Sequence, residues 1–143
     1  MSVTQLSVFL ENRPGHLQNI LRILSENNIN ITALTISETA EYGVVRMIVN
    51  DAEKAGVILK NNNITSKITE VLAIEIDDKP GSLYGVIDSF SRRDMNIEYM
   101  YAFPGKRDAK SIMIFRFDDI EAATKALTAE SYTILEMSEI IGE

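Results

Sequence analysis

The chain opens with the alternating pattern of a β-strand and continues with the periodicity of an α-helix. Leu6, Val8 and Leu10 lie at every second position, which predicts a strand with one apolar face. Apolar residues then recur at the i, i+3, i+4, i+7 spacing of one helical face: Leu17, Ile20, Leu21 and Leu24. Asn27 and Asn28 follow, and asparagine is common at the left-handed end of a helix. This segment therefore predicts one strand followed by one helix.

The rest of the first half predicts two strands, a helix and a last strand. The predicted elements are a strand over 29–36, a polar hairpin turn over 38–43, a strand over 44–49, a helix over 52–59 and a strand over 64–68. Asp51 is suited to be the N-cap of the second helix, because its carboxylate can accept hydrogen bonds from the first backbone N–H groups. Asparagines at 61–63 end that helix.

The second half repeats the first with an offset of 66 residues. Leu72, Ile74 and Ile76 match the first strand, and the helical face recurs as Leu83, Val86, Ile87 and Phe90. Further predicted elements are a strand over 97–103, a polar loop over 104–110, a strand over 112–117, a helix over 120–127 begun by Asp118-Asp119, and a strand over 132–137. Each half has the order β-α-β-β-α-β, which predicts an α+β fold of two ferredoxin-like units, with antiparallel sheets and helices on one face. We expect domains at 1–69 and 70–143.

A Pro-Gly turn joins the first strand to the first helix in both halves. It spans Glu11–Leu17 and recurs as Asp77–Leu83. Proline favours an extended residue before it, and glycine lets a ligand approach the backbone. The helix behind the turn begins with unpaired N–H groups and a positive dipole end, which suits a carboxylate or another small anion. An ordinary tight connection without a ligand is the alternative. On the ligand hypothesis, Gly81→Val should abolish binding and leave the fold largely intact.

Composition narrows the classes of partner and chemistry. The chain has 14 basic and 21 acidic residues, a net charge of −7, and no basic block, which argues against nucleic acid and anionic membranes. The absence of cysteine, of a secretory signal and of a long apolar run fits a cytoplasmic protein. One histidine and no cysteine leave few nucleophile–base pairs, and phosphate-loop and dinucleotide fingerprints are missing. We therefore expect no enzyme, no cofactor and no metal site.

The repeated motifs resemble those of ACT domains. Asn12-Arg13-Pro14-Gly15-His16-Leu17 is followed by Ile29-Asn30-Ile31, and Asp78-Lys79-Pro80-Gly81-Ser82-Leu83 by Met95-Asn96-Ile97. The resemblance extends over about residues 3–140. The chain is similar to stand-alone tandem ACT proteins of bacteria and archaea. It implies a regulatory homodimer that binds an amino acid between two ACT units, at the Pro-Gly loop of one and strand two of its neighbour. A regulated metabolic enzyme or a regulator is the further implied partner.

The resemblance gives two sets of candidate ligand-binding residues. They are Asn12, Pro14, Gly15, His16, Leu17, Asn30 and Ile31 in the first half, and Asp78, Pro80, Gly81, Ser82, Leu83, Asn96 and Ile97 in the second. The halves differ, because the Asp78 carboxylate could pair with a ligand ammonium, whereas the Asn12 amide could only donate or accept hydrogen bonds. His16 is either a solvated residue or a ligand contact. Asn30 and Asn96 either bind local backbone or contact the ligand.

An aromatic segment in the second half leaves two interpretations open. Tyr99, Tyr101 and Phe103 share one face of a predicted strand. They are sheet surface buried under the helices or against a partner, or they form an apolar wall of the ligand site. For the whole chain, an amino-acid sensor is the leading hypothesis. A constitutive assembly or partner-binding module is the main alternative, and a small enzyme using only carboxylates and tyrosines is a third.

Overall fold

The computed structural model describes residues 2–38, 42–105 and 109–141. The chain divides into two compact units, one built on Thr4–Thr69 and the other on Glu70–Ile140. We call them the N-terminal unit and the C-terminal unit. That the limits 1–69 and 70–143 define two separate domains stays a prediction. No helix in the described part of the chain is long and apolar enough to span a membrane.

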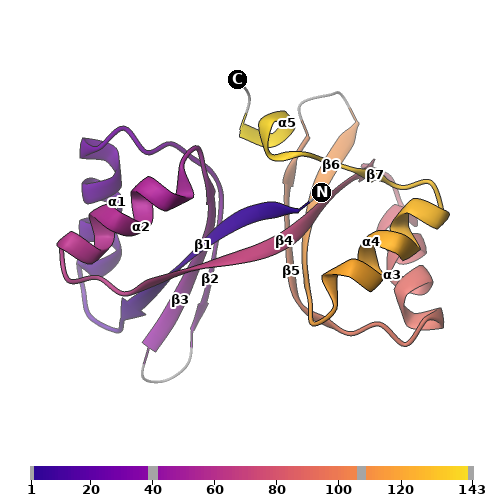
Figure 1. The fold of residues 1–143 in the computed structure, drawn as a ribbon, viewed down its shortest axis with the longest axis horizontal. Coiled ribbons are helices and arrows are strands. Elements are labelled where there is room, and N and C mark those ends of the chain that lie inside the picture. Colours follow the sequence, from indigo (N-terminus) through magenta and orange to yellow (C-terminus); the bar gives the residue numbers. More distant parts are fainter. Residues whose placement is uncertain (1, 39–41, 106–108, 142–143) are drawn as a thin grey trace. The chain divides into compact units, whose positions relative to one another are not determined.

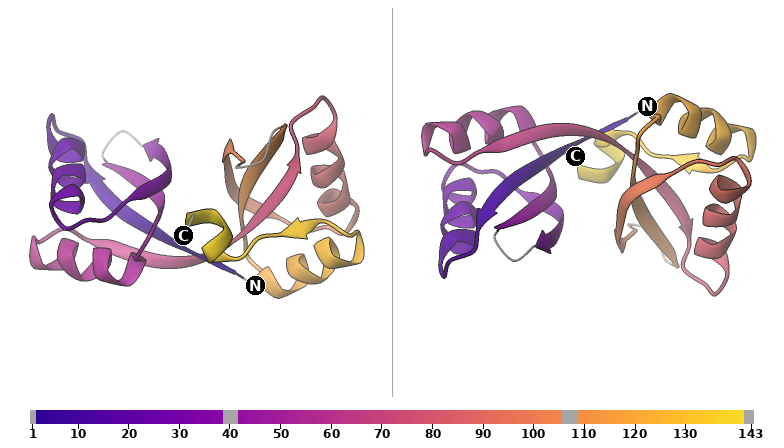
Figure 2. Two further views of the ribbon diagram at one scale, coloured as in Figure 1. Left: turned by 90° about the horizontal axis from the view of Figure 1, so that it is seen from above. Right: turned by 90° about the horizontal axis from the view of Figure 1, so that it is seen from below.

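The N-terminal unit is an antiparallel sheet with two helices on one face (Figures 1 and 2). Its elements are β1 (Val3–Glu11), α1 (His16–Glu26), β2 (Ile31–Glu38), β3 (Tyr42–Val49), α2 (Ala52–Asn61) and the beginning of β4 (Ser66–Asp77). The strands lie in the order β2-β3-β1-β4, and β3 is antiparallel to both β1 and β2. The alternating residues Leu6 and Val8 pack against Ile20 and Leu24 of α1, as their spacing predicts.

The C-terminal unit repeats this arrangement (Figure 1). It contains the rest of β4, α3 (Ser82–Arg92), β5 (Ile97–Pro104), β6 (Lys110–Phe117), α4 (Ile120–Ala129), β7 (Thr133–Ile134) and α5 (Met137–Ile141). The strand order is β7-β4-β6-β5. Phe90 lies at the centre of the core, with ring centroids 5.5 Å from Phe115 and 4.8 Å from Phe117, both edge to face. The predicted fold class, two ferredoxin-like α+β units, is confirmed.

Two predicted strands differ from the structure. The strands predicted over 64–68 and from Val71 are one continuous strand, β4, of 12 residues. The last strand was predicted over 132–137, but β7 covers only Thr133–Ile134 and is followed by the short helix α5. Glu139 is the third residue of that helix, and its Oε1 accepts a 2.8 Å hydrogen bond from the N–H of Glu136, the residue before the helix. The centres of the predicted turns at 38–43 and 104–110 lie outside the described residues.

The four longer helices end in the same way. A non-glycine residue with positive φ follows each of them: Asn28 (60°), Asn63 (60°), Asp94 (53°) and Ser131 (62°). The next residue then donates its N–H back to the last helical turn, as in the 2.9 Å bond from Ile29 to the Leu24 carbonyl. The asparagines predicted to end α1 and α2 do so. In α3 and α4, an aspartate and a serine have the same role.

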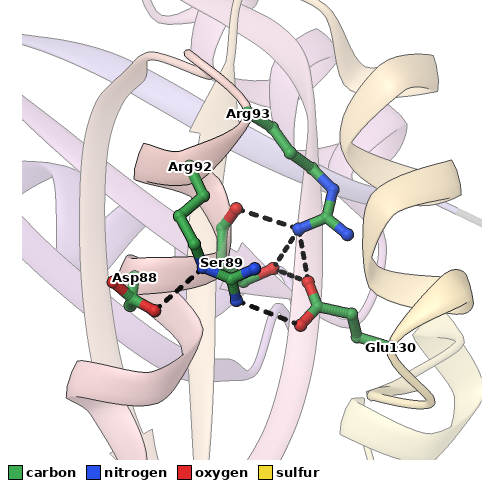
Figure 3. Close-up of polar contacts among 5 residues, drawn as sticks. All are labelled: Asp88, Ser89, Arg92, Arg93 and Glu130. Atoms are coloured by element: carbon green, nitrogen blue, oxygen red, sulfur yellow. Dashed lines mark hydrogen bonds and ion pairs between the residues drawn. The ribbon is translucent and has the colours of Figure 1, made fainter.

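Polar side chains join α3 to α4 in the C-terminal unit (Figure 3). Ser89, which is 1% exposed, donates its hydroxyl to Glu130 Oε2. Arg93 Nη1 donates to the same oxygen and to the Ser89 carbonyl. Arg92 lies between Asp88, at 3.0 Å, and Glu130 Oε1, at 3.5 Å. A single carboxylate therefore connects the end of one helix to the last turn of the other.

Candidate functional site

Both Pro-Gly turns have the same backbone geometry. Gly15 has φ +84° and Gly81 has φ +92°, and each immediately precedes the first residue of its helix. Residues with a Cβ rarely adopt this conformation, so the turn itself requires glycine. A Cβ built on either glycine meets no described atom within 4 Å. Gly81→Val would therefore strain the backbone of the turn as well as block the approach of a ligand. That it abolishes binding and leaves the fold largely intact stays a prediction.

The helices behind these turns begin differently from the other two. Within the described residues, no side chain caps α1 at Gly15 or α3 at Gly81. By contrast, the carboxylates of Asp51 and Asp119 accept 3.0 Å hydrogen bonds from backbone N–H groups at the start of α2 and α4, as predicted. The N–H groups of His16 and Ser82 donate to the Arg13 and Lys79 carbonyls at 3.4 and 3.3 Å. The N–H groups of the next residues of α1 and α3 have no side-chain cap from the described residues at these exposed turns, so an acceptor from outside can reach them.

The acidic residue at the end of each strand is paired locally. Glu11 lies 2.6 Å from Arg13, and this hydrogen bond lowers the pKa of Glu11 below its ordinary value. Asp77 lies 2.5 Å from Lys110 and 3.7 Å from Lys79, and the hydrogen bond from Lys110 is the main cause of its lowered pKa. Both carboxylates are therefore ionised near neutral pH, with a cation beside them. The next residues, Asn12 and Asp78, are exposed.

His16 is not a solvated residue. Its side chain is turned inward and only 5% of the residue is exposed. The Nδ1 atom accepts a 2.7 Å hydrogen bond from the backbone N–H of Glu11, so the imidazole is bound to the last residue of β1. No pattern in the sequence indicates this contact, because a histidine in a first helical turn is usually solvated. Leu17, the next predicted site residue, packs against the core of the N-terminal unit.

A cavity of about 350 Å³ lies beside the C-terminal turn. Gly81 and Ser82, both predicted site residues, line it, whereas Leu83 is 40% exposed. The other lining residues were missed: Glu75, Ile76, Asp77, Gly85, Lys110, Ser131, Tyr132 and Thr133. The strand order was the available signal, because a ferredoxin-like unit places its last strand next to its first. A larger hollow, of about 790 Å³ between α2 and residues 63–68, is lined by none of the predicted residues.

The predicted strand-two residues lie at the other end of each sheet. Ile97 pairs with Phe117, whereas Asp77 at the turn pairs with Lys110. Seven residues separate the two positions on β6, which is about 23 Å of strand at roughly 3.3 Å per residue. The N-terminal unit is arranged alike, since Ile31 pairs with Val49 but Glu11 with Tyr42. One unit therefore does not bring its own turn and its own strand-two residues together.

Asn30 is held through its backbone. Its N–H donates a 2.9 Å hydrogen bond to Asn50 Oδ1, and its carbonyl accepts a 3.2 Å bond from the Asn50 N–H. This supports the local-backbone interpretation of the position, with the side chain of Asn50 as the partner. Asn30 and Asn96 are both exposed.

The aromatic residues of β5 lie on the sheet face away from α3 and α4. Tyr101 pairs with Ile114 and Phe103 with Ile112, whereas the helix-packed core contains Met113 and Phe115. Residues on one strand alternate between the faces, so the tyrosines and Phe103 face the other way. The interpretation that helices cover them is wrong. A surface against a partner, or a wall of a ligand site, remains open.

Comparison with known proteins identifies the family. A family model described as "ACT domain pair" matches residues 1–141. The crystal structure of protein BT0572 from Bacteroides thetaiotaomicron is 34% identical, with a TM-score of 0.93 over 100% of this chain and 98% of that one.

More distant structures share the fold. The aspartate kinase regulatory subunit from Thermus thermophilus, in its ligand-free form, has a TM-score of 0.61 at 15% identity, over 88% of this chain and 90% of that one. The same subunit from Thermus flavus has a TM-score of 0.63 at 15% identity, over 88% of both chains. No curated protein sequence matches significantly. By its sequence over 1–141 and its close structural match, the chain belongs to the family of ACT domain pairs.

Proposed function

We propose that this protein is a non-catalytic regulatory module that binds a free amino acid at its Pro-Gly turns. The observation that most directly supports this proposal is a difference between the helix N-termini. Asp51 and Asp119 cap α2 and α4, whereas α1 and α3 follow glycines and have no capping side chain among the described residues. An open helix start suits an anionic group. The regulatory role named for the aspartate kinase subunits with this fold supports the same proposal.

The turn offers complementary groups for the two ends of an amino acid. The ligand carboxylate accepts hydrogen bonds from backbone N–H groups after Gly15 or Gly81. Its ammonium meets the Asn12 amide or the Asp78 carboxylate, both of which are exposed. Pro14 and Pro80 hold the turns, and the exposed Leu83 and the cavity-lining Ser82 lie next to the ligand, whereas His16 and Leu17 support the N-terminal turn from the core side.

The strand-two residues must come from another unit. Each unit places them at the far end of its own sheet, so Asn30 and Ile31, or Asn96 and Ile97, can complete a site only for a neighbour. Binding then favours one packing of units, because a ligand shifts an equilibrium by its differential affinity for the two states. We further propose a cytoplasmic homodimer that passes this change to a metabolic enzyme or a regulator.

Thermal unfolding in a panel of free amino acids tests the proposal. A ligand at 100 times its Kd stabilises by about 2.7 kcal/mol, which for a chain of this size raises the midpoint by roughly 5–10 °C. We expect one amino acid, or a few related ones, to give such a shift at millimolar concentration. A flat panel at saturating concentrations contradicts amino-acid binding.

A second candidate function is a constitutive assembly module. Strand β2 is at the edge of the N-terminal unit's sheet, and it carries Leu34 and Ile36, which are 39% and 42% exposed. Exposed apolar residues on an edge strand favour association with another chain. Sedimentation velocity of wild type and Ile36→Lys, each with and without amino acids, separates the functions. An Ile36-dependent oligomer that ignores every amino acid favours the assembly module.

A further inference from the structure

His16 and Ser82 occupy the same position in the two repeats, 66 residues apart. In the N-terminal unit, the His16 imidazole is buried and accepts the backbone N–H of Glu11. That N–H points toward the β4 side of β1, because the Phe9 N–H, two residues earlier, donates to the Thr65 carbonyl. His16 thus satisfies the last outward-pointing donor of the strand.

Asp77 carries the equivalent donor in the C-terminal unit. The Asp78 N–H donates a 2.8 Å bond to the Ala109 carbonyl on the β6 side. Successive N–H groups of a strand alternate in direction, so the Asp77 N–H points away from β6, toward β7. No described residue accepts a hydrogen bond from it. Ser82 occupies the position at which the N-terminal unit has His16, and the cavity of about 350 Å³ lies beside Ser82.

The cavity is built from polar groups that can hold a small acceptor. Ser82 lines it, and the Tyr132 hydroxyl lies 3.7 Å from where a Cβ on Gly85 would be. Any side chain at position 85 would therefore approach this hydroxyl, and the N-terminal repeat has Asn19 at that position. Lys110, paired with Asp77, adds a cation to the rim. Glu75 and Asp77 also line the cavity, and Asp77 is the residue that Lys110 pairs with. The hydroxyl donors, the strand N–H and the lysine are the groups of this cavity that suit one carboxylate.

We propose that ligand binding is confined to the C-terminal turn, because His16 fills at the N-terminal turn the place that a ligand carboxylate oxygen takes beside Ser82. The inference rests on the proposed function and narrows it to one site in each chain. The imidazole Nδ1 is an internal substitute for the ligand acceptor. The residue pair His16 and Ser82 thus determines which repeat binds.

Amide hydrogen exchange, followed by nuclear magnetic resonance, tests the geometry without any ligand. In the wild type, the Glu11 amide should exchange more slowly than the Asp77 amide. His16→Ser should speed exchange at Glu11, and Ser82→His should slow it at Asp77, each by roughly fivefold, the effect of one hydrogen bond. Ser25→His, at an exposed position of α1, is the control and should change neither. Equal protection of Glu11 and Asp77 in the wild type overturns the inference.

Titration of the same samples with the amino-acid panel tests the binding site. We expect amide shifts at residues 77–85 in the wild type, loss of these shifts in Ser82→His, and their retention in His16→Ser. Shifts of equal size at residues 11–19, or undiminished binding by a folded Ser82→His protein, overturn the inference and leave the proposed function standing. Absence of shifts with every amino acid contradicts the proposed function itself, and the inference with it.

Discussion

Arg93 and Glu130 connect the ends of α3 and α4, with Nη1 and Oε2 2.5 Å apart (Figure 3). Ser89 donates its hydroxyl to the same carboxylate. In the N-terminal repeat, the residue 66 positions before Ser89 is Ile23, which belongs to the apolar core. The residue that follows α2, as Glu130 follows α4, is Asn62, whose Nδ2 donates a 2.8 Å hydrogen bond to the Ile58 carbonyl. In the C-terminal unit the residue after the second helix thus binds the first helix, whereas in the N-terminal unit it binds its own helix.

This carboxylate makes stability depend on pH. The hydrogen bond from Ser89 is the main cause of the lowered pKa of Glu130, and Arg93 adds to it. A carboxyl with a lowered folded-state pKa stabilises above its unfolded value, here 4.5, and that contribution is lost as the pH falls through the folded-state pKa. Glu130→Gln should therefore lower the urea midpoint near neutral pH and lose less stability than wild type below pH 4.5.

Urea unfolding at a series of pH values measures this difference. Glu121→Gln is the control, because Glu121 is an exposed carboxylate on the same helix. Its pH profile should follow that of the wild type. If Glu130→Gln keeps the wild-type difference in stability between neutral and acid pH, Glu130 is not the source of the dependence.

The left-handed turn glycine should resist substitution even though space is available. Gly81→Ala places a Cβ in open space but at φ +92°, which costs about 1–2 kcal/mol of unfolding free energy. The control is Gly56→Ala within α2, whose Cβ would lie 3.8 Å from Ser66 Oγ, an ordinary contact. That substitution should stabilise by roughly 0.5–1 kcal/mol, since glycine is unfavourable inside a helix. Equal effects of the two changes in urea unfolding would contradict the strain argument.

The charge of Asp78 should matter for ligand affinity. Asp78→Asn gives the C-terminal turn the amide that the N-terminal turn has at Asn12. Hydrogen bonds to charged groups are worth about 1 kcal/mol more than neutral ones, so the amino-acid Kd should rise roughly five- to tenfold. Calorimetric titration measures it, with Asn12→Asp as the matched control. An unchanged Kd for Asp78→Asn removes the ammonium contact from the proposal.

The capped helices provide a prediction independent of any ligand. Asp119 Oδ1 accepts the Ala122 N–H, so Asp119→Ala should lower the unfolding free energy by about 1 kcal/mol. Asp118 accepts only the neighbouring Asp119 N–H among the described residues, and Asp118→Ala should cost less. Comparison of the two urea midpoints decides whether the cap or the acidic pair as a whole stabilises α4.

Much of the fold was predictable because the same pattern of apolar and polar residues occurs in both halves of the sequence. The apolar spacing of α1 and α3, the strand alternation, and the caps Asp51 and Asp119 each have a local cause in neighbouring residues. Helix α5 was missed because the residue before it is Glu136, and glutamate is not among the common N-cap residues; only the contact from Glu139 to the Glu136 N–H supports its first turn. The join inside β4 was missed because Thr69 and Glu70 interrupt the apolar alternation between Ile68 and Leu72, so that one strand was predicted as two.

The candidate site was less predictable, because it depends on residues far apart in the sequence. The motif identified Gly81 and Ser82, but Lys110 and Tyr132 reach the same cavity only through the strand order. The burial of His16 follows from a hydrogen bond to the end of a strand, and no periodicity or composition reports such a bond. Sequence patterns thus identified the turn in both halves. The difference between its two copies, the buried His16 and the cavity beside Ser82, depends on packing that these patterns do not report.

The ends of the four longer helices offer positions at which substitution could increase the stability of the protein. After each of the four longer helices, a side chain occupies a left-handed position that glycine would occupy without a steric penalty: Asn28, Asn63, Asp94 and Ser131. Exchange to glycine relieves strain of up to about 1 kcal/mol per position, least at asparagine, partly offset by the greater freedom of the unfolded chain. Such substitutions should therefore raise the melting temperature of the protein, and they leave both Pro-Gly turns unchanged.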